Sequence, residues 1–542
     1  MNTLSRRFSF SSVCRPKSLG QELADWADRF GSRPALADGR RCLTYTELHR
    51  RVEAIARGLH ARGIRPGMRA ILQFPNSMEF VLACFACLRL GVIPVLTLPA
   101  WREADLDSFC DAVTPAVYFA PNRHAGYGYL PMMRAMQARH DSLVLLASDA
   151  EAPGVAALEE IEAEGAGAGR DGSADLPHPS PDSAALVIMT GGTTNLPKMV
   201  PKIHNQYMAA AAASALRLGM TKDSVYLVTL PIGHHFSMGC PGILGAFSLG
   251  AKAVIAQSPS FDTVFDLVER ERVTHMPAVP PLLRAWADAR EFDDTDLSSL
   301  ELVQVGGGPL DAETLAEAEK RLGCGISQAY GFTEGCVCYS ECGPEAARDE
   351  GQRQGLPLFE EDELRVVDSA GRDLPPGEEG ELLFRGPCLL SGYFMQDAGT
   401  NAQWLTPDGW YRSGDIAAWT EDGRIRIVGR LKDIINRAGE KFSARENELR
   451  LLQHPAAAGC AVVGVPDRML GERQCVFILP AGEERPGLAE IRAWLAERGA
   501  APFKLPDQLE YVNEWPVTAV GKLDKRKLTL MAQEQGRQAR GR

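Results

Sequence analysis

Short apolar runs alternate with segments of helical spacing along most of the chain, and this alternation restricts the fold more than any other feature. We expect strands over residues 68–74, 92–98, 225–230, 253–256 and 303–308, and helices over 77–90, 242–249 and 263–271. Strands that are joined by helices run parallel and carry helices on both faces of the sheet. The sequence therefore predicts an α/β fold with parallel-rich sheets.

The pattern changes after Gly355, where Pro and Gly residues separate short strands at 363–367 and 380–385. This change predicts a small β unit attached to the α/β body. The last stretch, roughly 110 residues, mixes helices and strands in the manner of an α+β domain. Residues 148–182 are rich in Ala, Gly, Glu and Pro, and we expect a surface excursion there.

The composition argues against several classes of protein. With 45% hydrophobic residues, 24% charged residues and a net charge of −12, the chain is expected to be globular and to bind no nucleic acid. Arg89, Gly91, Pro94 and Pro99 interrupt the apolar run 80–100, which favours a buried helix and strand over a membrane span. Thirteen cysteines without paired metal-ligand spacing indicate reduced thiols.

We expect a cytoplasmic protein, because the basic, Ser-rich start lacks an apolar signal segment. An organelle transit peptide is the alternative interpretation of this start.

A loop rich in Thr and Gly follows the apolar run 184–188. Its glycines allow the backbone to approach a ligand closely, and Lys198 adds positive charge, which suits a polyphosphate. The loop lacks the Gly-Lys-Ser/Thr ending of the mononucleotide P-loop, so an ordinary turn is the alternative. The candidate phosphate-binding residues are Thr190, Gly191, Gly192, Thr193, Thr194 and Lys198.

Four further motifs follow this loop. They are Gln328–Glu334 (QAYGFTE), Tyr411–Asp415 (YRSGD), Gly429–Lys441 and Pro516–Lys522 (PVTAVGK). In this order and spacing, the five motifs resemble the adenylate-forming superfamily of acyl-CoA ligases, luciferases and peptide-synthetase adenylation domains, across residues 23–533. Shorter segments resemble the free-standing aryl-acid AMP ligases of the dihydroxybenzoate and salicylate type: His204-Asn205, Pro231–Gly242, Ile435–Arg437 and Phe503–Asp507.

The resemblance implies a division of the chain into two domains. A large N-terminal AMP-binding domain would span residues 1–429, and a small mobile α+β domain would span 433–542. The hinge would lie at 430–432, with Lys432 absorbing the backbone change between two half-reactions. Most relatives have two glycines after the hinge strand, and Ala438 replaces the first of them here.

The resemblance also implies an enzyme that uses ATP and Mg²⁺. An aromatic carboxylate would attack the α-phosphate of ATP and give an aryl-adenylate and pyrophosphate. The residues that would complete the ATP site are Gly307, Tyr330, Gly331, Asp415 and Arg430. From the residues alone, Tyr330 could be a core aromatic, Asp415 a turn residue and Arg430 a solvated linker residue.

Four residues would act at the reacting groups if the resemblance holds. Lys522 would touch both the substrate carboxylate and the α-phosphate, and Thr333 would add a hydroxyl to the α-phosphate. His234 would lie near the carboxylate, and Glu334 would hold Mg²⁺. The alternatives are a helix-capping acid at Glu334 and an exposed charge at Lys522.

The wall of the acid pocket implied by the resemblance consists of His234, His235, Phe236, Cys240, Gly306, Gly307 and Val337. Close relatives have Asn at the position of His235, and Cys240 stands where dihydroxybenzoate enzymes often have Ser. A thiol hydrogen-bonds poorly, which removes a reason to prefer a second ring hydroxyl. We expect a monocyclic aromatic acid with one ortho polar group: salicylate first, then an aminobenzoate or a pyridine carboxylate. Either His could instead serve packing alone.

The second half-reaction would transfer the aryl group to a thiol. No carrier-type Gly-Gly-x-Ser motif follows Lys522, so we expect a separate carrier protein whose phosphopantetheine accepts the group. Siderophore or related nonribosomal peptide biosynthesis is the expected setting. The alternative acceptor is free coenzyme A, and a non-enzymatic adenylate-binding protein with a decayed site is the third hypothesis.

Overall fold

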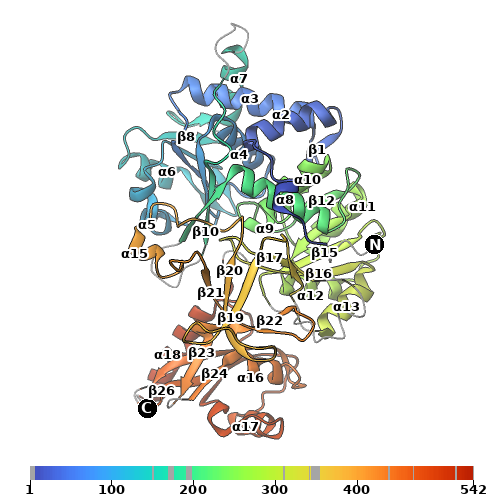
Figure 1. The fold of residues 1–542 in the computed structure, drawn as a ribbon, viewed down its shortest axis with the longest axis vertical. Helices are drawn as coiled ribbons and strands as arrows, with labels where there is room; N and C mark the ends of the chain where they lie inside the picture. The colour runs from blue at the N-terminus through green and yellow to red at the C-terminus, as the bar shows by residue number, and fades with distance from the viewer. Residues whose placement is uncertain are drawn as a thin grey trace. The chain divides into compact units, whose positions relative to one another are not determined.

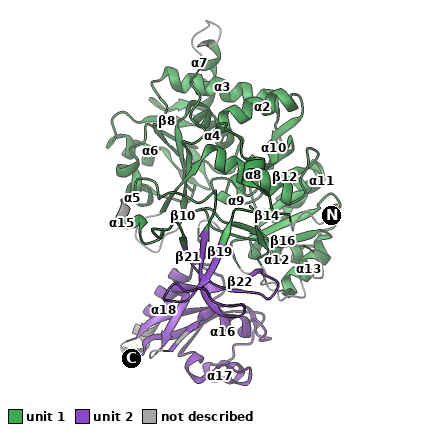
Figure 2. Cartoon of the chain, viewed as in Figure 1, with its two compact units in different colours: residues 1–363, 385–411 green, residues 364–384, 412–542 purple. Residues whose placement is uncertain are grey.

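The computed structural model describes residues 6–148, 152–168, 176–190, 198–308, 310, 312–340, 342, 354–437, 440–467, 469–518 and 522–540. The chain forms two compact units. The first unit consists of Met1–Glu363 and Arg385–Tyr411, and the second of Leu364–Phe384 and Arg412–Arg542 (Figure 2). The predicted hinge at 430–432 remains a prediction.

Two large sheets organise the first unit (Figure 1). The nine-stranded sheet has the order β18 (Leu356–Pro357), β17 (Val337–Tyr339), β16 (Gly325–Gly331), β15 (Leu302–Gly306), β14 (His275–Ala278), β12 (Val225–Val228), β13 (Lys252–Ile255), β1 (Pro34–Ala37), β2 (Cys42–Thr44). Its six central strands, from β16 to β1, pair in parallel. The outer pairs β1–β2, β16–β17 and β17–β18 are antiparallel.

The seven-stranded sheet has the order β11 (Lys198–Ile203), β10 (Ala184–Thr190), β4 (Ile93–Leu96), β3 (Arg69–Leu72), β5 (Val117–Ala120), β8 (Val144–Ala147), β9 (Ala156–Ala157). Only its β10–β11 pair is antiparallel. The predicted α/β fold with parallel-rich sheets is therefore confirmed.

Helices connect the strands of both sheets. In chain order they are α1 (Phe10–Val13), α2 (Leu19–Phe30), α3 (Tyr45–Ala61), α4 (Met78–Leu90), α5 (Glu103–Val113), α6 (Leu130–Gln137), α7 (Leu158–Ala168), α8 (His204–Arg217), α9 (His235–Gly239), α10 (Gly242–Leu249), α11 (Phe261–Glu271), α12 (Pro280–Ala289), α13 (Ala312–Leu322) and α15 (Ala398–Asn401). A two-stranded ribbon, β6 (Arg123–His124) with β7 (Tyr127–Gly128), completes the unit.

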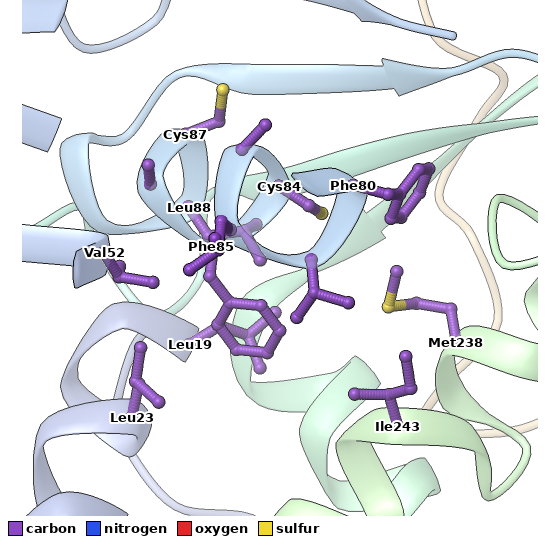
Figure 3. Packing of buried hydrophobic residues seen from close by; sticks show 14 of the residues in the cluster. Leu19, Leu23, Val52, Phe80, Cys84, Phe85, Cys87, Leu88, Met238 and Ile243 are labelled. Atoms are coloured by element: carbon purple, nitrogen blue, oxygen red, sulfur yellow. The ribbon is translucent and has the colours of Figure 1, made fainter. Parts of the chain in front are cut away.

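Helix α4 lies inside the core of the first unit. Side chains from α2, α3, α9 and α10 surround it, among them Leu23, Val52 and Ile243 (Figure 3). Ser77 caps the helix, since its hydroxyl accepts a hydrogen bond from the Phe80 N–H at 3.2 Å. Burying each large apolar side chain contributes about 1.5–3 kcal/mol. The apolar run at 80–100 is thus a buried helix followed by a buried strand, as predicted, and no helix of the described chain is long and apolar enough to span a membrane.

The expectation of a surface excursion over 148–182 is wrong in part, because helix α7 forms within it and packs against α3. A Cβ added to Gly165 would overlap the carbonyl oxygen of Ala54, and one added to Gly58 would overlap that of Ile161. The glycines therefore allow close contact between two helix backbones. The Ala and Gly residues of this stretch therefore serve helix packing in α7 as well as loops.

The second unit contains two further sheets. A four-stranded sheet has the order β19 (Glu363–Val367), β20 (Glu379–Arg385), β21 (Tyr411–Trp419), β22 (Ile425–Arg430). A five-stranded sheet has the order β24 (Glu440–Ser443), β23 (Ile434–Arg437), β26 (Gly471–Pro480), β25 (Ala457–Asp467), with β27 (Gln508–Tyr511) paired to β26. The helices of the unit are η3 (Leu431–Asp433), α16 (Ala444–Leu451), α17 (Leu488–Glu497), η4 (Pro502–Lys504) and α18 (Lys525–Arg540). The predicted β unit and α+β domain are both present.

Candidate active site

The Thr/Gly loop connects strands β10 and β11, and its two ends are adjacent. Thr190 lies opposite Lys198 in the antiparallel register of this hairpin. Gly191, Gly192, Thr193 and Thr194 lie outside the described residues. The described part of the hairpin therefore shows that the two ends of the candidate phosphate loop lie side by side, with Lys198 at one of them.

The ammonium of Lys198 lies among aromatic side chains. It donates a hydrogen bond to the Tyr393 hydroxyl at 3.0 Å and lies 3.1 Å from the centroid of the Trp404 ring. A cation over an indole face is attracted by the quadrupole of the ring, and burial strengthens that attraction. These contacts hold the positive charge at the end of the hairpin.

The Tyr393 hydroxyl connects this cation to the candidate metal-binding acid. It donates a hydrogen bond to Oε1 of Glu334 at 2.7 Å, and it lies 3.1 Å from the hydroxyl of Tyr411. Burial and the neighbouring Glu334 carboxylate raise the pKa of Tyr393, so the phenol stays protonated and acts as a donor. The sequence reasoning missed Tyr393 and Trp404, which lie in a stretch with no helical or strand periodicity and carry no motif of their own.

Thr333 and Glu334 are buried in the turn after strand β16. The backbone N–H of Leu390 donates to the carbonyl of Glu334 at 2.9 Å, which fixes the turn from the opposite side. Tyr330 is half-buried near the end of β16 and meets the Phe332 ring edge-on at 6.3 Å. At Gly331 a Cβ would overlap the carbonyl oxygen of Cys336. Backbone packing therefore explains this glycine whether or not a nucleotide binds beside it.

The predicted wall of the acid pocket comes from the end of strand β15, the start of strand β17, and helix α9 with its flanking residues. Phe236 faces Gly306: a Cβ at Gly306 would lie 3.1 Å from Cζ of Phe236 and 3.0 Å from the carbonyl oxygen of Ala329. Gly307 follows with φ of +83°. Phe236, Cys240 and Val337 belong to one apolar cluster. The structure thus places a flat aromatic ring against bare backbone in this wall.

The two histidines of the wall have different surroundings. Nδ1 of His234 accepts a hydrogen bond from the Phe236 N–H at 3.3 Å and so caps helix α9. His235 is buried and stacks on Tyr207, with Nδ1 3.2 Å from the Tyr207 hydroxyl. Burial, with Lys202 and His234 nearby, lowers the pKa of His235 well below its usual value. His235 is therefore a neutral imidazole.

Cys240 is a thiol at neutral pH. Burial raises its pKa to about 11, and its sulfur lies 3.2 Å from the Tyr339 hydroxyl. All thirteen cysteines are free. Among the described residues, no group of three or more His, Cys, Asp and Glu side chains is arranged to hold a metal ion.

The second unit brings together Asp415, Arg430 and Lys522. Asp415 and Arg430 are paired in the register of β21 and β22, and Nε of Arg430 lies 3.0 Å from Oδ1 of Asp415. Lys522 is half-buried. Its burial and the nearby Arg430 guanidinium lower its pKa to about 8, and Asp415 acts in the opposite direction. Lys432 lies in the short helix η3, and Ala438 lies outside the described residues.

Comparison with known proteins gives matches along most of the chain. Residues 23–394 match the family described as AMP-binding enzyme, and residues 446–522 match the AMP-binding enzyme C-terminal domain. The 2,3-dihydroxybenzoate-AMP ligase of Bacillus subtilis is 39% identical over 513 residues, which cover 94% of this chain and 93% of the relative. The salicyl-AMP ligase / salicyl-S-ArCP synthetase of Mycobacterium tuberculosis is 40% identical over 517 residues, 94% of this chain and 90% of the relative. The apo structure of MbtA from Mycobacterium smegmatis is similar with a TM-score of 0.71, at 36% identity over 96% of this chain and 95% of that chain.

Proposed function

The chain belongs to the AMP-binding enzyme family, and from that premise we propose that it joins an aromatic carboxylic acid to AMP and then loads the aryl group onto a carrier protein. The observation that carries this proposal is the wall formed by Phe236 and the bare backbone at Gly306. A Cβ at Gly306 would lie 3.1 Å from the Phe236 ring, so glycine lets this ring lie flat against the backbone, and the acid would occupy the space along the resulting flat, apolar wall. An aromatic acid suits such a space because it is thin and apolar on both faces.

The reaction requires two anions to meet, so the protein contributes position and charge. The substrate carboxylate attacks the α-phosphorus, the bond to the bridging oxygen of pyrophosphate breaks, and pyrophosphate leaves. Lys198 would neutralise the leaving phosphates, while Lys522 would neutralise the carboxylate and the α-phosphate during the attack. Such fixed charges are stronger in a water-excluded site than in solution, and positioning alone can supply about 7–11 kcal/mol.

The nucleotide would be held by groups whose chemistry matches it. Asp415 would accept hydrogen bonds from the ribose hydroxyls, and Tyr330 would stack on the adenine. Thr333 would donate to the α-phosphate. Arg430, which pairs with Asp415 in the structure, would extend toward the ribose or phosphates.

Mg²⁺ fits the buried carboxylate of Glu334. Magnesium commonly binds one or two carboxylates and takes its other ligands from substrate phosphates and water. Glu334 is 6% exposed and is held by the Tyr393 hydroxyl, so its position is fixed before any metal binds. When bound, the ion would neutralise phosphate charge.

A separate carrier protein is the proposed acceptor, in siderophore or related nonribosomal peptide biosynthesis. The Mycobacterium tuberculosis relative is named a salicyl-S-ArCP synthetase as well as a salicyl-AMP ligase, which supports transfer to a carrier. Free coenzyme A is the competing acceptor. The two acceptors can be distinguished by adding either purified carrier protein or coenzyme A to the enzyme with the same adenylate. The acceptor that forms the thioester is the one that the enzyme uses.

ATP–pyrophosphate exchange with a panel of acids tests the first half-reaction. We expect exchange with salicylate and related aromatic acids, and none with aliphatic acids of similar size. The Lys522→Ala variant should lose about 10²–10³-fold in exchange rate, the usual effect of removing one fixed charge-stabilising group. Exchange only with aliphatic acids, or an unchanged rate in the variant, would show that the proposed function is wrong.

A further inference from the structure

A small cavity with both polar and apolar lining residues adjoins the His235 side of the acid wall. Its volume is about 80 Å³, and its lining includes Lys202, Tyr207, His235, Val337 and Cys388. A cavity needs about 10–15 Å³ of such volume to hold one water molecule, so this one has room for several water-sized groups. His235 and Val337 line this cavity and also belong to the predicted acid wall, so the cavity lies beside the proposed substrate site.

Lys202 gives this cavity a buried positive charge. The residue lies on strand β11, is 7% exposed, and donates a hydrogen bond to the carbonyl oxygen of Thr333. Its Nζ lies 5.3 Å from the centroid of the Tyr207 ring. Among the described residues, no carboxylate forms an ion pair with it. A buried cation without a paired anion is costly, which indicates that an acceptor reaches it in the working enzyme.

The groups that face Lys202 from neighbouring elements set its charge state. Burial lowers the pKa of Lys202 to about 8, while Cys388, Glu334 and Cys240 act in the opposite direction. Tyr207 on α8 has a raised pKa because it is buried, and His235 on α9 is neutral. Below pH 8 the cavity therefore holds one positive charge supplied by Lys202 beside the uncharged Tyr207 and His235.

An ammonium has three donors and no acceptor, so the group that binds to it must accept hydrogen bonds or carry negative charge. A phenolic oxygen or a pyridine nitrogen next to the carboxylate satisfies this requirement. An aromatic amino group does not, because its N–H bonds would point at the ammonium and its lone pair is delocalised into the ring. The charge of Lys202 therefore separates acids that differ only at the ortho position.

We propose that Lys202 is a specificity-determining residue that binds a hydrogen-bond-accepting ortho substituent of the acid, so that 2-hydroxybenzoates are preferred over 2-aminobenzoates and unsubstituted benzoates. The inference rests on the proposed function, since it assigns the acid to the same wall. It adds the chemical class of the ortho group and the residue that selects it. If Lys202 only connected β11 to the turn at Thr333, its replacement would change the reaction rates with all acids to the same extent.

The test compares kcat/KM for salicylate, 2-aminobenzoate and benzoate in the exchange reaction of the wild type, Lys202→Gln and Lys202→Arg. We expect the wild type to prefer salicylate by about tenfold or more, the usual effect of one hydrogen bond to a charged group. Lys202→Gln should lose most of that preference, because its rate with salicylate falls more than its rate with benzoate, and Lys202→Arg should retain the preference. Equal losses for all three acids in Lys202→Gln, or a wild type that prefers 2-aminobenzoate, would overturn the inference.

A pH profile of the wild type gives a second readout that needs no variant. Lys202 is charged below its pKa of about 8 and neutral above it. The KM for salicylate should therefore rise relative to that for benzoate as the pH increases from 7 to 9, and a constant ratio of the two would count against the inference. If no aromatic acid supports exchange at all, the proposed function fails and this inference falls with it. If aromatic acids support exchange but Lys202→Gln has the same acid preference as the wild type, only this inference is contradicted and the proposed function stands.

Discussion

The Tyr393 hydroxyl lies between the two charged side chains that would hold the phosphates and the metal. It accepts a hydrogen bond from Lys198 and donates one to Glu334, so a single oxygen positions both. The Trp404 ring holds the same ammonium from another side. These residues are far apart in the sequence, and neither the glycine loop nor the QAYGFTE motif indicates Tyr393 or Trp404 as a partner. Only the folded chain shows which aromatic residues complete the site.

Replacing Tyr393 with Phe should weaken the use of ATP more than the binding of the acid. The variant leaves the Glu334 carboxylate and the Lys198 ammonium without their shared hydroxyl, and a hydrogen bond to a charged group contributes about 1.5–3 kcal/mol. We expect kcat/KM for ATP to fall by about ten- to a hundredfold while the KM for the acid stays within about twofold. Trp404→Phe, which retains an aromatic face, is the matched control and should show a smaller loss. An unchanged kcat/KM for ATP in Tyr393→Phe would contradict this role.

Most elements could be predicted from the sequence because each has a local signal. Helix α4 follows a Ser cap and ends at Gly91, and helix α10 has the predicted bounds of 242–249. Helix α7 was missed because its Ala and Gly residues are typical of loops. Their function is long-range: Gly165 faces the backbone of α3, which the local sequence cannot reveal.

The α3–α7 contact yields a prediction with a control in the same helix. Gly165→Ala should destabilise the first unit by about 1–3 kcal/mol, because the added methyl group overlaps the Ala54 carbonyl and the helices must separate. At Gly167 a Cβ meets nothing within 4 Å, so Gly167→Ala should be neutral or slightly stabilising. Calorimetric melting temperatures of the two variants check this. A lower melting temperature for Gly167→Ala than for Gly165→Ala would refute the packing argument.

At the scale of the whole molecule, each compact unit holds some of the residues of the proposed site. The first unit contains Lys198, Glu334 and the acid wall, and the second contains Asp415, Arg430 and Lys522. The resemblance of the motifs to the adenylate-forming superfamily indicated all of these residues. The motifs could not reveal the charge states: His235 is neutral, Cys240 is a thiol, and Lys202 and Lys522 are cations with lowered pKa values. These charge states follow from the burial of the side chains, which depends on the complete fold.

The central claim is that the carboxylate of an aromatic acid attacks the α-phosphate of ATP and that a thiol later attacks the acyl carbon. Salicylate labelled with oxygen-18 in both carboxylate positions follows this path atom by atom. After turnover with ATP and a thiol acceptor, we expect one heavy oxygen in the AMP and none in the pyrophosphate, measured by mass spectrometry. Heavy oxygen in inorganic phosphate together with ADP, or AMP that carries no label, would contradict the account.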